Sequence, residues 1–250
     1  MDEQLNKNNH QVREITHLVG NLKPVTLRLY TPNWLCRYRA ETFSTKEPET
    51  LKWIDDNDGV LFDIGANIGL YTMYHAKSKR HNVYAFEPSF FNLPLLSKNI
   101  NSNDLQDKVS IISNPLSDSV QFANFKLASI DEGGALSAFG VDFDQNGDEI
   151  ESIFCYKTLG YTLDFLFEHG ILTELPAMIK VDVDGIEHLI LSGAKETLRN
   201  PTCKTVLIEI NDNFSDQADE TAKILFECGF SLKEKFQQAG ETYNQIWVKR

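Results

Sequence analysis

Cysteine is scarce in this chain of 250 residues, and the four that occur (Cys36, Cys155, Cys203 and Cys228) lie far apart. None of them forms the Cys-x-x-Cys pair that is typical of zinc sites and redox motifs. The histidines are equally scattered and give no zinc pattern. We therefore expect small apolar thiols in a reducing compartment, with neither a disulfide framework nor a zinc site.

Positive charge and long apolar runs are also in short supply. The chain has 24 Lys and Arg against 36 Asp and Glu, a net charge of -12, which argues against a general nucleic-acid binder. No apolar run is long enough to span a bilayer, and the polar N-terminus lacks the apolar core of a signal peptide. We expect a cytoplasmic, soluble protein with no transmembrane segment and no nucleic-acid partner. The sequence leaves a homo-oligomer open.

From Val60 onward, short apolar runs alternate with helical patterns. The pattern predicts strands over 60–64, 82–86, 109–113, 178–183 and 205–210, and helices over 69–79, 90–101, 163–168, 186–198 and 216–228. Two extended segments, 121–129 and 152–159, flank an acidic stretch, and strands 230–236 and 243–249 form a C-terminal hairpin. This order predicts an α/β fold of the Rossmann-like kind. Its sheet is mainly parallel, with one antiparallel hairpin and helices on both faces.

The N-terminal part fits this alternation less well. Residues 1–24 are polar with a weak helical pattern, 25–30 alternate like a strand, and 46–54 read as a helix with Pro48 in its first turn. We expect residues 1–55 to form an extension packed as a cap on one core domain, residues 56–250.

The most informative segment is Val60-Leu-Phe-Asp-Ile-Gly-Ala-Asn-Ile-Gly69. A strand ends near Asp63, and Gly65 and Gly69 frame a turn where a ligand can approach the backbone at a helix N-terminus. A dinucleotide fingerprint requires a third glycine, but Asn67 takes the middle position and no third glycine follows. An acid at the strand end would repel a pyrophosphate, whereas it suits the cationic aminoacyl end of S-adenosylmethionine. A plain strand-to-helix turn remains an alternative.

Two later strands end in side chains suited to the same ligand. Glu87 follows the strand 82–86, where a carboxylate would accept hydrogen bonds from ribose hydroxyls. Its alternative role is to complement the dipole of the next helix. Asn114 follows the third strand and can read an adenine edge, or it forms an Asn-Pro turn.

Five motifs together resemble the FkbM family of S-adenosylmethionine-dependent methyltransferases. They are DIGANIGLYT (63–72), AFEP (85–88), TLDF (162–165), IKVDVDGIEHLILSGA (179–194) and VLIEIN (206–211). The resemblance implies the class I methyltransferase fold, S-adenosylmethionine as cofactor, and O-methylation of hydroxyls on sugars and natural products. The segment 31–55 is similar to members from polysaccharide gene clusters. The expected cofactor contacts are Asp63, Gly65, Ala66, Asn67, Gly69, Glu87, Asn114 and Asp182. The family commonly has Glu where this chain has Asp184.

Methyl transfer to a hydroxyl requires alignment of the reacting atoms and removal of the hydroxyl proton. Acids gather at the end of the strand 178–183, where Asp182 can have its pKa raised by its acidic neighbours. We expect Asp182 to be the catalytic base or a cofactor contact, with Glu187 and Glu209 as further acids of the site. Solvated strand-end acids are the alternative, and His188 is a less favoured rival base.

A divalent metal is a second open question. Asp182, Asp184 and Glu209 are oxygen ligands of the kind that Mg²⁺ prefers, but their spacing is not diagnostic. We expect no metal at this site.

The acceptor side is assigned to Trp34, Arg37 and Arg39. Indole faces stack on sugars, and guanidinium groups bind diphosphates or carboxylates. A cap with arginines in salt bridges is an equal alternative, and the acidic stretch 131–151 is either a lid or a solvated loop. We expect an S-adenosylmethionine-dependent O-methyltransferase that acts on a hydroxyl of a sugar, glycoconjugate or polysaccharide precursor. The rival interpretations are an NAD(P)-dependent oxidoreductase and a non-catalytic cofactor-binding partner.

Overall fold

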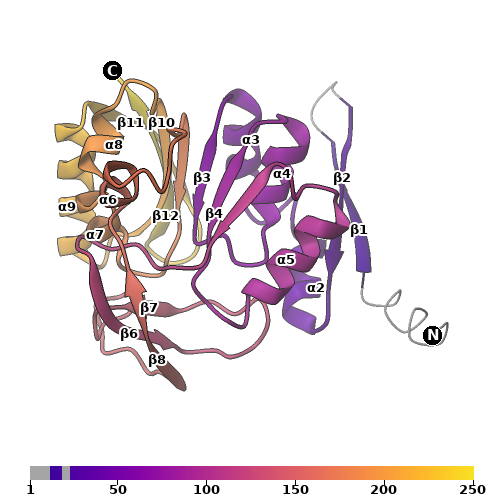
Figure 1. Ribbon diagram of the computed structural model, residues 1–250, viewed down its shortest axis with the longest axis horizontal. Coiled ribbons are helices and arrows are strands. Elements are labelled where there is room, and N and C mark those ends of the chain that lie inside the picture. Colours follow the sequence, from indigo (N-terminus) through magenta and orange to yellow (C-terminus); the bar gives the residue numbers. More distant parts are fainter. Residues whose placement is uncertain (1–11, 19–22) are drawn as a thin grey trace.

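The computed structural model describes residues 12–18 and 23–250, and a seven-stranded sheet forms its centre (Figure 1). The strand order is β11-β12-β10-β9-β3-β4-β5. The strands are β3 (Leu61–Ile64), β4 (Val83–Phe86), β5 (Val109–Ile112), β9 (Met178–Val181), β10 (Thr205–Asn211), β11 (Phe230–Gln237) and β12 (Thr242–Lys249). The first five run parallel, and β11 and β12 form the antiparallel hairpin at one edge. This architecture confirms the expected fold class.

Both faces of the central strands are buried, which explains their mainly apolar sequence. All four residues of β3 are buried, and neighbours in the strand point to opposite faces. Leu61 joins a cluster with α3 (Pro48–Asp56), α4 (Leu70–Ser78) and α5 (Leu93–Ser102). Phe62 joins the other cluster, which contains residues of α6 (Leu163–Glu168), α7 (Glu187–Ser192), α8 (Lys195–Arg199) and α9 (Ser215–Glu227).

The predicted helix 186–198 is wrong as a single element, because it breaks into α7 and α8. A Cβ on Gly193, between them, would lie 2.2 Å from the Ser117 carbonyl oxygen. Asp164 of α6 then accepts backbone N–H groups of Glu196 and Thr197 at 2.8 Å each. The second helix therefore starts anew at a carboxylate supplied from elsewhere in the chain.

A small antiparallel sheet, in the order β7-β6-β8, lies below the central sheet in Figure 1. Its strands are β6 (Gln121–Leu127), β7 (Ser137–Phe139) and β8 (Phe154–Gly160). The extended segments expected around 121–129 and 152–159 are confirmed. The short strand β7 was not expected, since it falls inside the acidic stretch.

The weak helical pattern expected near the N-terminus is wrong for Val12–His17, which form the strand β1. This strand pairs antiparallel with β2 (Val25–Tyr30), and Ile15 lies opposite Leu27. The rest of that prediction, residues 1–11 and 19–22, lies outside the described residues. The helix α2 (Trp34–Glu41), which was also not expected, starts at Asn33, whose side chain accepts the Cys36 N–H.

The N-terminal elements share a hydrophobic cluster with the central sheet. Leu27 and Leu29 of β2 and Trp53 of α3 are buried with Leu61 of β3. We propose on this basis that residues 1–55 are a cap on the core domain 56–250. Within the described residues, the helices are too short or too polar to cross a membrane.

Candidate active site

A cavity, which we call the strand-end cavity, lies at the carboxyl ends of β3, β4, β9 and β10. The empty space between its lining residues, including its opening to solvent, is about 1010 Å³. Seven residues expected from the sequence line it: Arg39, Gly65, Asn67, Glu87, Asn114, Asp182 and Glu209. An adjoining pocket is lined by Ala66 together with Lys46 and Lys180. Ligands of parallel sheets bind at such strand ends.

The glycine turn after β3 packs directly against the end of β9. Gly65 has φ +86, and a Cβ on it would lie only 1.9 Å from the Asp182 carbonyl oxygen. Asn67 follows with φ 52 and donates its amide to the Gly134 carbonyl at 2.8 Å. The Asn67 Oδ1 atom is buried without a hydrogen-bond partner, so an acceptor is left for a ligand.

Asp63 lies beneath this turn and does not line the cavity. It is buried and accepts a 2.5 Å hydrogen bond from the Thr72 hydroxyl of α4. Burial raises the pKa of Asp63. Its position supports the turn from below, and its role as a direct cofactor contact stays a prediction. Gly69 likewise lies outside the cavity lining, at the start of α4.

Glu87, after β4, presents a buried carboxylate to the cavity. Its two oxygens accept the backbone N–H groups of Asn67 at 2.7 Å and Ser89 at 2.9 Å. Burial raises the pKa of Glu87 to about 7, although these hydrogen bonds oppose the shift. The side chain therefore links the glycine turn to β4, and it has lone pairs left for hydroxyl donors.

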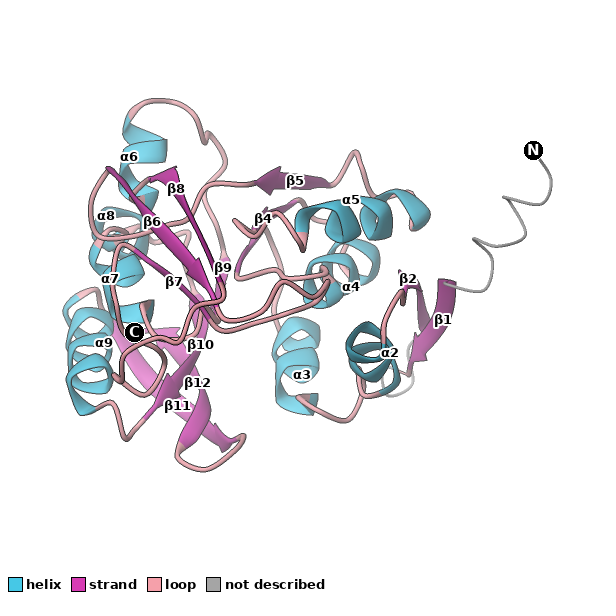
Figure 2. Ribbon diagram, turned by 90° about the horizontal axis from the view of Figure 1, so that it is seen from below, coloured by secondary structure: helices cyan, strands magenta, loops and turns pink. Residues whose placement is uncertain are grey.

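Residues 131–137, which we call the strap, run from the small sheet toward α2 (Figure 2). Asn33 donates to the Glu132 carbonyl at 2.8 Å, and Arg39 Nε donates to the Gly133 carbonyl at 3.0 Å. At the other end, Asp184 accepts the backbone N–H groups of Leu136 at 2.7 Å and Ser137 at 3.3 Å. The strap lines the strand-end cavity, so the first part of the predicted lid lies at the site.

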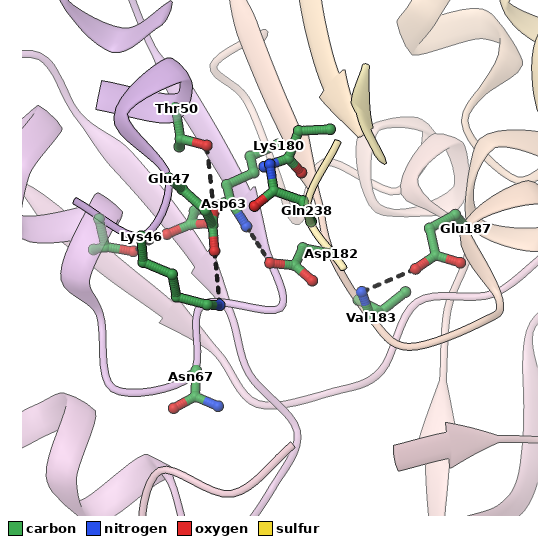
Figure 3. Close-up of polar contacts among 12 residues, drawn as sticks. Lys46, Glu47, Thr50, Asp63, Asn67, Lys180, Asp182, Val183, Glu187 and Gln238 are labelled. Atoms are coloured by element: carbon green, nitrogen blue, oxygen red, sulfur yellow. Dashed lines mark hydrogen bonds and ion pairs between the residues drawn. The ribbon is translucent and has the colours of Figure 1, made fainter. Parts of the chain in front are cut away.

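An ion pair marks the end of β9 (Figure 3). Lys180 Nζ donates to Asp182 at 2.7 Å; the Lys180 side chain is 2% exposed and that of Asp182 is 29% exposed. Burial alone would raise the pKa of Asp182, but the Lys180 ammonium holds it below its usual value, so the expectation that acidic neighbours raise this pKa is wrong. Glu209 follows Ile208, the register partner of Val181, and the Asp182 charge together with burial raises the pKa of Glu209 to about 9. The Lys180 cation thus favours the ionised form of Asp182, whereas the Asp182 charge and burial favour the protonated form of Glu209.

Glu187 does not line the strand-end cavity, and in Figure 3 its carboxylate is directed to the backbone N–H of Val183. Its carboxylate accepts the backbone N–H groups of Val183 and Gly185 at 3.1 Å each, and the amide of Gln217 also donates to it. Burial raises the pKa of Glu187 to about 7. In this geometry Glu187 holds the turn after β9. Its catalytic role stays a prediction, and the side chain does not contact the strand-end cavity.

The three acceptor-side residues are separated by the fold. Arg39 lines the cavity, whereas Trp34 is 67% exposed on α2 and Arg37 is also exposed. His188, the rival base, is absent from the cavity lining and faces the Phe214 ring at 6.2 Å.

Two functional positions were missed in the sequence. Lys180 was given no role, although a lysine inside a buried strand pattern is a signal in itself. Asn92 donates to the Gly134 carbonyl at 3.1 Å and accepts the Gly133 N–H at 2.9 Å. No local sequence pattern identifies it, because its partners lie about 40 positions away.

The residues around the cavity fit S-adenosylmethionine. Glu87 can accept ribose hydroxyls, the unpartnered Asn67 Oδ1 offers a buried acceptor, and the ionised Asp182 suits a cationic group. Asn114 lines the cavity but donates its amide to the Leu159 carbonyl at 2.9 Å, which restricts it for reading an adenine edge. Among the described residues, no group of three or more His, Cys, Asp or Glu side chains has the arrangement of a metal site.

Comparison with known proteins identifies the family. The model of the FkbM methyltransferase domain matches residues 63–232, more than half of the chain. No curated protein matches. The solved structure of methyltransferase FkbM from Methylobacillus flagellatus KT gives a TM-score of 0.51 at 13% identity, and covers 76% of this chain and 43% of that one. This chain therefore spans less than half of that protein.

A putative rRNA methylase from Clostridium thermocellum gives a TM-score of 0.50 at 8% identity, over 82% of this chain and 97% of that one. At such low identities both structures support the fold alone. The family match argues against the oxidoreductase interpretation. The sequence also lacks the third glycine that a dinucleotide fingerprint requires. The chain therefore belongs to the FkbM methyltransferase family, and its domain is an S-adenosylmethionine-dependent methyltransferase.

Proposed function

We propose that this methyltransferase acts on a hydroxyl of a sugar or glycoconjugate, as a cytoplasmic step in the assembly of a polysaccharide precursor. Bound S-adenosylmethionine supplies the methyl group. The observation that carries the proposal is the position of Asp182. Its carboxylate lines the cavity, and Gly65 of the glycine turn packs against the backbone carbonyl of Asp182. A base is thereby fixed beside the cofactor turn.

In this proposal Asp182 accepts the proton of the acceptor hydroxyl. Its ion pair with Lys180 keeps the carboxylate in the form that can accept a proton at neutral pH. Glu209, whose pKa is raised by the Asp182 charge and by burial, donates a hydrogen bond toward the same space in its protonated form and helps to hold the acceptor. Both side chains lie at the same edge of the sheet, because β9 and β10 are parallel neighbours.

Arg39 is the proposed acceptor-binding cation. It lines the cavity, its Nε is engaged by the strap, and the rest of its guanidinium can serve an anionic group on a sugar acceptor. Trp34 and Arg37 are proposed to contact the acceptor outside the cavity, where their exposure on α2 leaves their surfaces available.

Transfer of tritium from methyl-labelled S-adenosylmethionine to a panel of sugars, nucleotide sugars and oligosaccharides tests the proposal. We expect labelled methyl ethers with the wild-type protein. In Asp182→Asn, we expect S-adenosylhomocysteine binding within a few-fold of wild type and turnover reduced by about 100-fold or more, as for loss of a general base.

Two results would contradict this assignment. Labelling of RNA in place of every saccharide would transfer the function to nucleic acid, which the net charge of -12 disfavours. Unchanged turnover in Asp182→Asn would remove Asp182 as the base. Cofactor binding with no transfer to any member of the panel would favour the non-catalytic partner.

A further inference from the structure

We propose that Lys180 is a positioning residue, which acts through Asp182 by holding that carboxylate ionised and directed into the strand-end cavity. Lys180 is almost fully buried and is absent from the lining of the strand-end cavity, so it is not offered as a residue that contacts the acceptor. The inference rests on the proposed role of Asp182 as the base. In this inference, the buried ammonium of Lys180 determines the pH range in which the Asp182 carboxylate is ionised.

The geometry of the pair carries this inference. The two side chains leave the same strand two residues apart, so they project to one face of the sheet. Lys180 Nζ lies 2.7 Å from Asp182 Oδ2, with the lysine almost fully buried and the aspartate partly exposed. The Tyr71 ring packs over the ammonium, with Nζ 5.2 Å from the ring centroid. The cation is therefore fixed below the carboxylate, and the open side of the carboxylate faces the cavity.

Several charged groups from neighbouring elements surround the pair. Asp63 of β3 is the register partner of Lys180 and adds a second negative charge beside the ammonium. Lys46, before α3, and Arg39 of α2 act on Asp182 in the same direction as Lys180 but less strongly. The acids that act on this cluster from further elements are Glu47, Asp184 and Glu209. Three carboxylates, those of Asp182, Asp63 and Glu47, therefore act directly on the buried ammonium of Lys180.

An unpaired buried ammonium would be costly, so the lysine has to be explained. A structural role alone would be served by an apolar side chain, since buried ion pairs stabilise folds little or not at all compared with apolar replacements. Placement of the cation directly under the one partly exposed carboxylate of β9 favours a functional reason. The same arrangement favours the protonated form of Glu209, which lies beside Asp182 at the ends of the neighbouring strands.

Titration of the carboxyl carbons by NMR, in protein labelled with ¹³C-aspartate, tests the inference without an acceptor or a cofactor. The Asp182 signal is assigned by its loss in Asp182→Asn. In the wild-type protein, we expect Asp182 to titrate below the usual range for aspartate. In Lys180→Met, we expect its midpoint to move up by roughly 1 to 3 pH units, as expected on loss of a neighbouring opposite charge. Lys180→Arg, which keeps a cation, should restore a low midpoint.

A matched control is Lys52→Met, which removes the exposed ion pair between Lys52 and Asp56, 2.6 Å apart on α3. It should leave the Asp182 midpoint where it is. If Lys180→Met does not fold, the wild-type and Lys180→Arg titrations still decide the matter. A wild-type midpoint at or above the usual range would overturn the inference, as would an unmoved midpoint in folded Lys180→Met. A low midpoint together with full turnover in Asp182→Asn would retain the electrostatic role of Lys180 and refute only the base.

Discussion

The carboxyl ends of β4 and β9 each present an acidic side chain to the same cavity, but the two carboxylates are held in different ways. Glu87, after β4, accepts backbone N–H groups from Asn67 and Ser89, and burial raises its pKa to about 7. Asp182, after β9, is paired with the buried ammonium of Lys180, which lowers its pKa. Neutral donors leave one carboxyl group near its titration point, whereas a full charge keeps the other ionised.

This difference shows that position in the fold does not by itself decide the chemistry of a strand-end acid. An acid that holds a ligand by hydrogen bonds can be kept by backbone donors, which also fix its orientation. An acid that accepts a proton must be ionised and open on one side. The end of β4 therefore suits cofactor binding, and the end of β9 suits the reaction.

The largest expected effect comes from Gly65→Ala, which breaks both regions at once. The new Cβ would meet the Asp182 carbonyl, and φ +86 is strained for alanine. We expect a loss of about 3 kcal/mol in the free energy of unfolding and no measurable S-adenosylhomocysteine binding. Urea unfolding and calorimetry measure the two effects.

The control for this change is Gly170→Ala, because Gly170 has φ +65 but no atom within 4 Å of the added Cβ. It should cost about 1 kcal/mol, from backbone strain alone, and leave binding intact. Equal effects of the two substitutions would show that the contact between the turn and β9 is unimportant.

Glu87→Ala is expected to have the next largest effect and separates the two strand ends. Loss of a charged acceptor should weaken S-adenosylhomocysteine binding by about 100-fold, or about 2.7 kcal/mol, with turnover at saturating cofactor largely kept. Asp182→Asn should show the reverse pattern. Glu174→Ala serves as the control, since Glu174 accepts the Asn82 amide at 2.9 Å near the opposite end of β4. If Glu87→Ala lowered turnover and spared affinity, the division of roles would be wrong.

The smallest expected effect is the dependence of cofactor affinity on pH. We propose that the ionised form of Glu87 accepts the ribose hydroxyls; because its pKa is about 7, affinity should then fall as pH decreases through 7. The fall should approach tenfold per pH unit at lower pH, by linkage to one proton. Asp182 adds nothing in this range, because its pKa is lowered. Calorimetry with S-adenosylhomocysteine between pH 5.5 and 8.5 checks this, with Glu87→Gln as the variant whose profile should be flat.

Much of the fold could be predicted because the sequence marks its strands strongly. The strand β2 and the helix α6 have the bounds that were expected, since each is a compact apolar pattern between clear breaks. The strand β1 could not be predicted, because it has few apolar residues and depends on pairing with β2. A local sequence pattern carries no information about which other segment a strand pairs with.

The site divides in the same way. Glu87 and Asp182 were found because each ends an obvious strand, and parallel strands bring their ends to one edge. Glu187 was expected at the site because it closely follows the end of β9. Its position at the start of α7 instead directs its carboxylate to the N–H groups of Val183 and Gly185. The strap falls in the stretch that was expected as a possible lid, but its contacts could not be foreseen, because Asn67 and Gly134 meet across 67 positions.

Calorimetric titration of the wild-type protein with S-adenosylhomocysteine and, in parallel, with NAD tests the central claim most directly. We predict saturable binding of one S-adenosylhomocysteine per chain and no binding of NAD at the same concentrations. Tight binding of NAD with no binding of S-adenosylhomocysteine would contradict the account.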